Sequence, residues 1–143
     1  MIARLAVVVA VVAAAAGLAA SGALAVLATI GLGPAAHPVT NATALWIPVK
    51  YRCTHAAFFN LRVTVFQSDV GAVARGKMHV VCSGELQHGA VKVVQGSKHP
   101  RSFKDGYARA CWLAIVQKPP GTKPGGYSDL KSSCNGLTVA PKS

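Results

Sequence analysis

The feature that most restricts the fold of this chain is a regular alternation of apolar and polar residues over residues 45–53. The positions on one side are Leu45, Ile47, Val49, Tyr51 and Cys53, and those on the other are Trp46, Pro48, Lys50 and Arg52. A period of two is that of a β-strand with one face on a core. Because Pro48 lacks the N–H that a sheet ladder uses, the pattern predicts an edge strand or a bulge here.

Five further segments have strand-like patterns and are separated by turns rich in Gly, Asp and Ser. The predicted strands are residues 60–67, 77–82, 90–95, 107–117 and 136–140. We expect Leu61, Val63 and Val65 to point inward and Arg62 and Thr64 outward. Short strands without helical periodicity predict an all-β domain, an antiparallel β-sandwich of about six to seven strands. This domain would cover residues 45–140, with residues 141–143 as a tail.

Four cysteines lie within residues 53–134, and an even number in a small exported domain indicates disulfides. Three connectivities are possible. We expect Cys53–Cys82 with Cys111–Cys134, because strands that are near neighbours in the chain meet at the lowest cost. Each bridge would stabilise the fold by about 3 kcal/mol in the chain-entropy description. The spacing contains no Cys-x-x-Cys pair, so we predict no zinc site, no other metal and no cofactor.

Residues 5–32 carry no charged side chain and follow a single Arg4. A short positive start, an apolar run and small residues are the parts of a secretory signal peptide, with cleavage after Ala25 or Ala36. The alternative is an uncleaved anchor helix that ends near residues 31–34. We therefore predict a signal peptide or membrane anchor over residues 1–36 and an extended linker over residues 37–44. In both cases the remaining chain faces the outside, as a secreted or a membrane-anchored protein.

The charge is strongly positive beyond this leader. Residues 37–143 hold fourteen of the fifteen Lys and Arg residues and all four acids, a formal charge of +10. Such an excess attracts anionic partners, which outside a cell include wall polymers, acidic lipids, nucleic acid and acidic proteins. The alternative interpretation is that the charge serves solubility alone.

A polar loop over residues 96–106 concentrates basic side chains and has aromatic residues interleaved with them. Basic and aromatic residues together can bind phosphate polymers. The candidate binding residues are Lys98, Arg101, Phe103 and Lys104. In the alternative interpretation, Phe103 and Tyr107 fill the core where the loop joins a strand. A second candidate is the Pro- and Gly-rich loop of residues 118–133.

The sequence does not indicate an active site. Its four carboxylates are scattered, and it contains no Gly-x-Ser-x-Gly motif. Ser128 and Lys131 have Ser-x-x-Lys spacing, but the partner motifs of that enzyme class are absent. We predict a non-enzymatic binding domain for an anionic polymer or a protein, and we do not expect nucleic acid. The alternative is a subunit or adaptor of an extracellular assembly, in which residues 43–51 add an edge strand to a partner.

Three short motifs resemble a known group of proteins. They are Tyr51-Arg52-Cys53, Val81-Cys82-Ser83-Gly84 and Phe103-x-x-Gly106-x-Ala108-x-Ala110. Together they resemble small secreted proteins of actinobacteria, an uncharacterised family of immunoglobulin-like sandwiches with two disulfides. The resemblance covers residues 45–140 and implies a bacterial, exported β-sandwich. It implies no activity and no site residues.

Overall fold

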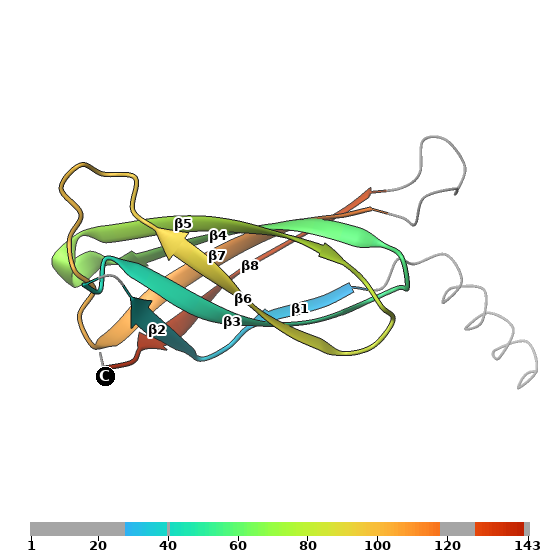
Figure 1. Ribbon diagram of the computed structural model, residues 1–143, viewed down its shortest axis with the longest axis horizontal. Helices are drawn as coiled ribbons and strands as arrows, with labels where there is room; N and C mark the ends of the chain where they lie inside the picture. Colours follow the sequence, from blue (N-terminus) through green and yellow to red (C-terminus); the bar gives the residue numbers. More distant parts are fainter. Residues whose placement is uncertain (1–27, 40, 118–127, 142–143) are drawn as a thin grey trace, which may run out of the picture.

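The computed structural model describes residues 28–39, 41–117 and 128–141 as strands, turns and loops (Figure 1). The elements in chain order are β1 (Ala28–Leu32), β2 (Ala35–Val39), β3 (Ala44–Cys53), β4 (Phe58–Gln67), the 3-10 turn η1 (Ser68–Val70), β5 (Ala72–Val81), β6 (Gln87–Val94), β7 (Gly106–Gln117) and β8 (Ser128–Val139). Within these residues, no helix has both the length and the apolar character that a membrane span needs.

All eight strands belong to one sheet in the order β1-β3-β2-β8-β7-β4-β5-β6, and β3 also pairs with β6. This last pairing closes the sheet into a seven-stranded barrel, because β1 and β2 follow one another along the same edge of β3 (Figure 1). Neighbouring strands are antiparallel except β2 and β8, which are parallel.

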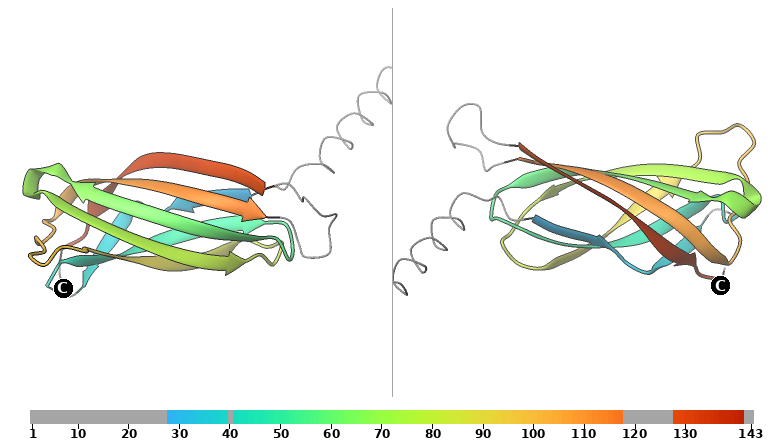
Figure 2. Two further views of the ribbon diagram at one scale, coloured as in Figure 1. Left: turned by 90° about the horizontal axis from the view of Figure 1, so that it is seen from above. Right: turned by 180° about the vertical axis from the view of Figure 1, so that it is seen from behind.

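The predicted all-β class is confirmed, but the sheet closes as a barrel and does not remain two separate sheets. The two junctions between its walls are short. β5 meets β6 at one pair, Arg75 with Val94, and β2 meets β8 at two pairs, Ala35 with Thr138 and Ala36 with Val139. One wall is β8-β7-β4-β5 and the other is β6-β3 with β1 and β2 (Figure 2). Strands facing a barrel interior and strands facing a sandwich core alternate in the same way, so the sequence pattern did not distinguish them.

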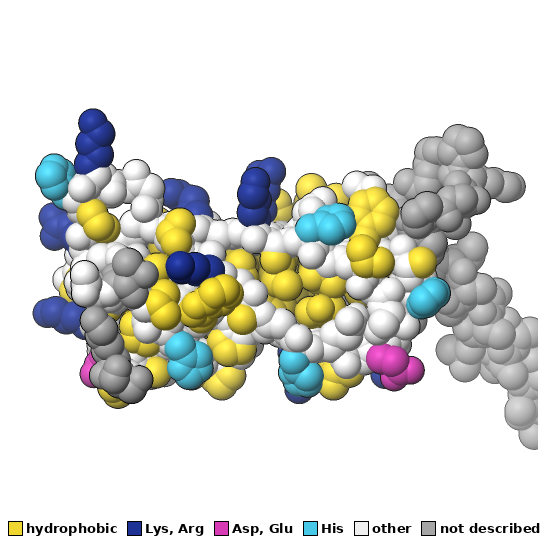
Figure 3. Space-filling model, in the orientation of Figure 1, with side chains coloured by type: hydrophobic (Ala, Val, Ile, Leu, Met, Phe, Trp, Pro, Cys, Tyr) yellow, Lys and Arg dark blue, Asp and Glu magenta, His cyan; other side chains and the backbone are white. Residues whose placement is uncertain are grey.

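The barrel has two ends, which we name after a residue at each. The Cys53 end comprises residue 28, residues 53–58, residues 81–87 and the ends of β7 and β8 at residues 117 and 128. The Phe103 end comprises residues 39, 41–44, 67–72, 94–106 and 139. Both junctions between the walls lie toward the Phe103 end. Toward the Cys53 end β5 and β6 diverge, and hydrophobic side chains are visible between them (Figure 3).

The core lies between the walls and is built by the inward positions of each strand. Leu45, Ile47 and Val49 are buried, as the alternation predicted, and Trp46 and Lys50 on the opposite side of β3 are exposed. The same alternation in β4 buries its three predicted inward residues. An edge-on contact between the rings of Tyr51 and Phe59, with centroids 5.5 Å apart, fills the Cys53 end of the core. Alternation in the sequence therefore identified the inward face of these strands correctly.

The structure corrects the boundaries predicted for the N-terminal part of the chain. Residues 28–39, expected to be leader and linker, form β1 and β2. Ala36 is fully buried, and its carbonyl accepts a hydrogen bond from the Ala140 N–H at 2.8 Å. The Pro34 carbonyl likewise accepts from the Thr138 N–H at 2.8 Å. An anchor helix reaching residues 31–34 and a linker beginning at residue 37 are therefore wrong, whereas residues 1–27 lie outside the described part.

Of the two alternatives predicted at Pro48, an edge strand or a bulge, the edge strand was wrong, because β3 is paired along both of its sides. Pro48 is tolerated because it lies opposite the interruption between β1 and β2. There the Gly33 N–H donates to the Pro48 carbonyl at 2.7 Å. A Cβ atom at residue 33 would lie 2.9 Å from the Pro48 Cβ, so glycine is required at this close approach.

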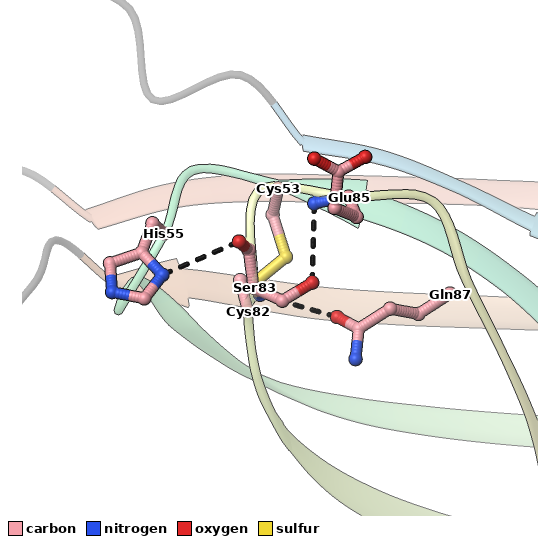
Figure 4. The surroundings of a disulfide bond; sticks show 6 residues. All are labelled: Cys53, His55, Cys82, Ser83, Glu85 and Gln87. Carbon is pink, nitrogen blue, oxygen red and sulfur yellow. Dashed lines mark hydrogen bonds between the residues drawn. A yellow bond between two sulfur atoms is a disulfide. The ribbon is translucent and has the colours of Figure 1, made fainter.

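Both predicted disulfides, Cys53–Cys82 and Cys111–Cys134, are present. The Cys53–Cys82 disulfide is buried at the Cys53 end, and hydrogen bonds hold the turn that follows Cys82 (Figure 4). There the His55 Nδ1–H donates to the Ser83 carbonyl at 3.3 Å, and the Ser83 N–H donates to Gln87 Oε1 at 3.3 Å. The second joins directly opposite residues of β7 and β8. Two disulfides are typical of proteins from oxidising compartments.

Candidate functional site: a basic outer face

The outer sides of β5, β4, β7 and β8 form one continuous surface, which we call the wide face. These strands are seen side by side in the view from above (Figure 2, left). Their register fixes which side chains are neighbours. Lys77 lies beside Arg62, which lies beside Leu113. In the adjacent row toward the Cys53 end, the order is His79, Asn60, Ile115 and Leu130.

The charged side chains of strands β3 to β7 all have one sign. Strands β3 to β7 contain seven Lys and Arg residues and no Asp or Glu. Four of these basic residues project from the wide face: Arg62, Arg75, Lys77 and Arg109. Asp69, Glu85 and Asp105 lie in turns outside the strands, and the fourth acid, Asp129, belongs to β8. On the other side of the barrel, the space-filling view also has many basic and few acidic side chains (Figure 3).

The most unusual pair on the wide face is Arg62 directly opposite Lys77. Like charges at directly opposite positions of two antiparallel strands destabilise a sheet. Arg75 is two residues further along β5, opposite Thr64, and adds a third positive charge nearby. The pair therefore places two like charges next to each other on the outer surface of the sheet.

A shallow pocket surrounds this pair on the wide face. Its lining residues are Asn60, Arg62, Lys77, Met78, His79, Leu113 and Ile115. The His79 Nδ1–H donates to Asn60 Oδ1 at 2.8 Å, and the His79 ring lies 5.7 Å from the ring of Phe58. These contacts hold His79 over the sheet, so that the pocket presents two positive charges with one imidazole beside an apolar floor.

The wide face also carries much of the exposed apolar surface. Of the eight large hydrophobic side chains that are exposed in the described residues, five project from it: Val73, Val81, Tyr107, Ile115 and Leu130. Three of them lie toward the Cys53 end: Val81, 62% exposed, Ile115, 38%, and Leu130, 64%. The wide face therefore combines a basic centre with apolar positions toward one end.

The basic loop predicted from the sequence lies at the Phe103 end, where the structure fixes it firmly. Phe103 is only 4% exposed, and its N–H donates to the Ala42 carbonyl at 2.7 Å. The Gln95 side chain donates to the carbonyls of Thr43 and Arg101 and accepts from the Arg101 N–H. Phe103 thus closes this end of the barrel, and Gln95 sets the path of the loop above it.

Gln67 holds the other side of this loop and is the one buried polar side chain among the described residues. Its amide donates to the carbonyls of Lys104 and Tyr107, at 2.8 and 3.1 Å, and accepts from the Lys104 N–H at 2.8 Å. A side chain with three such bonds fixes the backbone on which the Lys104 side chain projects into solvent.

The structure separates the four candidate binding residues. Lys98, Arg101 and Lys104 are exposed, and the Arg101 side chain passes over Gly71, close to the edge of the wide face. Phe103 lies in the core, as the alternative interpretation stated, and its role is to position the loop. Tyr107, considered with it, is 70% exposed and lies on the wide face against Gly136.

The sequence reasoning missed the basic centre of the wide face. It had placed Arg62 on an outward position of its strand, but nothing in the sequence gave the register that makes Lys77 its neighbour. Charge density along the chain drew attention to the loop of residues 96–106 instead.

The described part of the chain does not assemble a metal site or the Ser-x-x-Lys arrangement considered from the sequence. No three His, Cys, Asp or Glu residues among residues 28–39, 41–117 and 128–141 come together as metal ligands. Ser128 and Lys131, with their Ser-x-x-Lys spacing, lie in strand β8 and not at the start of a helix. Residues 118–127 of the second candidate loop lie outside the described residues.

In the strand-addition alternative a partner strand would pair with β3, but both sides of β3 already pair with other strands of the barrel. Residues 44–51 of β3 pair with β6, and the other side of β3 pairs with β1 and β2. Addition of a partner strand here would require displacement of one of these neighbours.

No protein-family model matches the chain, and no curated protein is significantly similar to it. The resemblance to secreted actinobacterial proteins therefore stays a prediction.

Proposed function

We propose that this protein is an exported, non-enzymatic binding domain whose wide face recognises a multivalent anion, such as a phosphate- or carboxylate-bearing polymer. The observation that carries the proposal is the Arg62–Lys77 pair, which lies on two neighbouring strands, β4 and β5, that contain no acid. An anion bound between the two side chains would neutralise both charges and so offset the free energy that their repulsion costs.

The spacing of the basic groups suits a ligand with repeated charges. Neighbouring strands are about 5 Å apart, and outward residues along one strand are about 7 Å apart. Arg62, Lys77 and Arg75 therefore present three charges within the reach of adjacent groups on one polymer. Arg109 continues the series toward the Phe103 end, and the fixed loop adds Arg101 and Lys104 at its rim. Such a row binds through additive Coulomb attraction and needs no deep cavity.

Export is part of the proposal and rests on two features. Both disulfides favour an oxidising compartment, and the uncharged residues 5–27 precede the first strand.

The test is binding of the full chain to long-chain inorganic polyphosphate, measured by fluorescence anisotropy at low and at physiological salt. Arg62→Glu with Lys77→Glu should weaken binding at low salt by more than about tenfold, given roughly 1 kcal/mol per basic residue at an anionic surface. The matched control is Lys50→Glu with Arg52→Glu, which makes the same change of net charge on the opposite wall. Equal losses in the two double variants would show that net charge alone attracts the polymer and would refute the proposed site.

A further inference from the structure

We infer that the Cys53 end of the wide face docks onto a lipid bilayer that contains acidic headgroups. The apolar side chains of this end would enter the interfacial layer while the adjacent basic residues contact the headgroups. The inference rests on the proposed function, because the same basic residues supply the attraction. It goes further by naming the partner as a membrane surface and by giving the apolar positions a role.

The first observation is the arrangement of apolar and basic positions. Val81, Ile115 and Leu130 project from three strands at the Cys53 end, with half-buried Phe58 between them. The Arg62–Lys77 pair follows in the next row. Apolar groups beside a basic band are the pattern with which proteins bind acidic membrane interfaces. A soluble polyanion makes no use of exposed Val, Ile and Leu.

The second observation is the direction from which the chain arrives. Ala28, the first described residue, pairs with Cys53 and so lies at this same end. The residues before it, from Leu5 to Leu27, contain no charged side chain. A segment of this composition directs a chain to a membrane. The end of the barrel that carries the exposed apolar side chains is thus also the end that is covalently nearest to a membrane-directed segment.

A second copy of this chain is a poorer occupant of the same surface. Two wide faces brought together would oppose Arg62, Lys77 and Arg75 with their own copies, without an acid in β4, β5 or β7 to compensate. Charge complementarity therefore favours an anionic surface over self-association.

The experiment compares the full chain on vesicles of phosphatidylcholine alone and of phosphatidylcholine with phosphatidylglycerol, using hydroxyl-radical footprinting read by mass spectrometry. On acidic vesicles, oxidation of Leu130, Ile115 and His79 should fall by at least about threefold, as expected for side chains that enter the interface. Trp46, which is 41% exposed on the opposite wall, should be oxidised equally on both vesicle types. Unchanged oxidation of the wide face, or equal protection of Trp46, would overturn the inference. This side-chain readout also excludes attachment through residues 5–27 alone, which would leave the wide face exposed.

Two variants separate this inference from the proposed function. Val81→Ser with Leu130→Ser should lower partition onto acidic vesicles by about tenfold, since it removes two apolar side chains from the interface. Binding to soluble polyphosphate should not change. The matched control is Val73→Ser with Val94→Ser, which removes two exposed valines toward the Phe103 end and should retain vesicle binding. Polyphosphate binding without vesicle binding in the wild type would refute the membrane inference alone, whereas loss of both would refute the proposed function too.

Discussion

Replacement of Gln67 by leucine tests how the basic loop is held at the Phe103 end. The side chain is 4% exposed and makes three hydrogen bonds, two to carbonyls and one from the Lys104 N–H. Leucine has a similar volume, so it fills the space but leaves these three backbone groups without their partner. Each net hydrogen bond is worth about 1 kcal/mol. The expected loss in the free energy of unfolding is therefore about 3 kcal/mol, or about 10 °C in Tm.

Urea denaturation followed by tryptophan fluorescence measures this loss, since Trp112 is buried in the core. The control is Gln87→Leu, which removes a single exposed hydrogen bond of 3.3 Å from the Ser83 N–H. This variant should lose less than about 0.5 kcal/mol, as surface substitutions do. In Gln67→Leu the Phe103 amide should also exchange its hydrogen faster, because its bond to Ala42 belongs to the same loop. A loss below about 1 kcal/mol would mean that water replaces the Gln67 contacts, and the account of a rigid loop would be refuted.

Three other predictions concern charge, redox chemistry and processing. Lys77→Glu should raise the free energy of unfolding in urea by up to about 1 kcal/mol, because it turns a repulsive pair with Arg62 into an attractive one. The same variant should bind polyphosphate more weakly. A lower free energy of unfolding would contradict the claim that Arg62 and Lys77 repel each other. Mild reduction with a soluble phosphine should open Cys111–Cys134 first, because Cys134 is exposed, whereas both cysteines of Cys53–Cys82 are buried. Alkylation at timed intervals followed by mass spectrometry measures the order in which the two disulfides open. The reverse order would refute this reasoning. N-terminal sequencing of the exported protein should find its first residue at or before Ala28, because a later cut removes β1; a start within β2 would show that the barrel closes without it.

The sequence predicted the strands because their alternation reflects burial directly. In β4 the predicted inward residues Leu61, Val63 and Val65 are buried, but the inward positions of Phe59 and Gln67 were missed. The disulfide pairing followed from the proximity of the cysteines along the chain. β1 and β2 were missed for a physical reason. Ala28–Leu32 and Ala35–Val39 are rich in Ala, Gly and Pro and follow a longer apolar run, so composition linked them to the leader. Their pairing with β3 and β8 depends on contacts that are distant in the sequence.

The basic site could be predicted only in part. The outward position of Arg62 followed from the alternation, but its adjacency to Lys77 depends on the register of β4 against β5. In this hairpin η1 and Gly71, with a φ of 65°, set that register. Phe103 illustrates the opposite case. Its neighbours Arg101 and Lys104 suggested a ligand site, whereas its apolar ring is needed to close the barrel.

The most direct test of the central claim is a titration of isotope-labelled protein with a short inorganic polyphosphate, followed by amide and side-chain chemical shifts in NMR spectra. The account predicts the largest changes at Arg62, Lys77 and Arg75, with smaller ones at Arg109 and little change at Lys50 on the opposite wall. Changes confined to residues 96–105, or spread evenly over both walls, would contradict recognition of an anionic partner by the wide face.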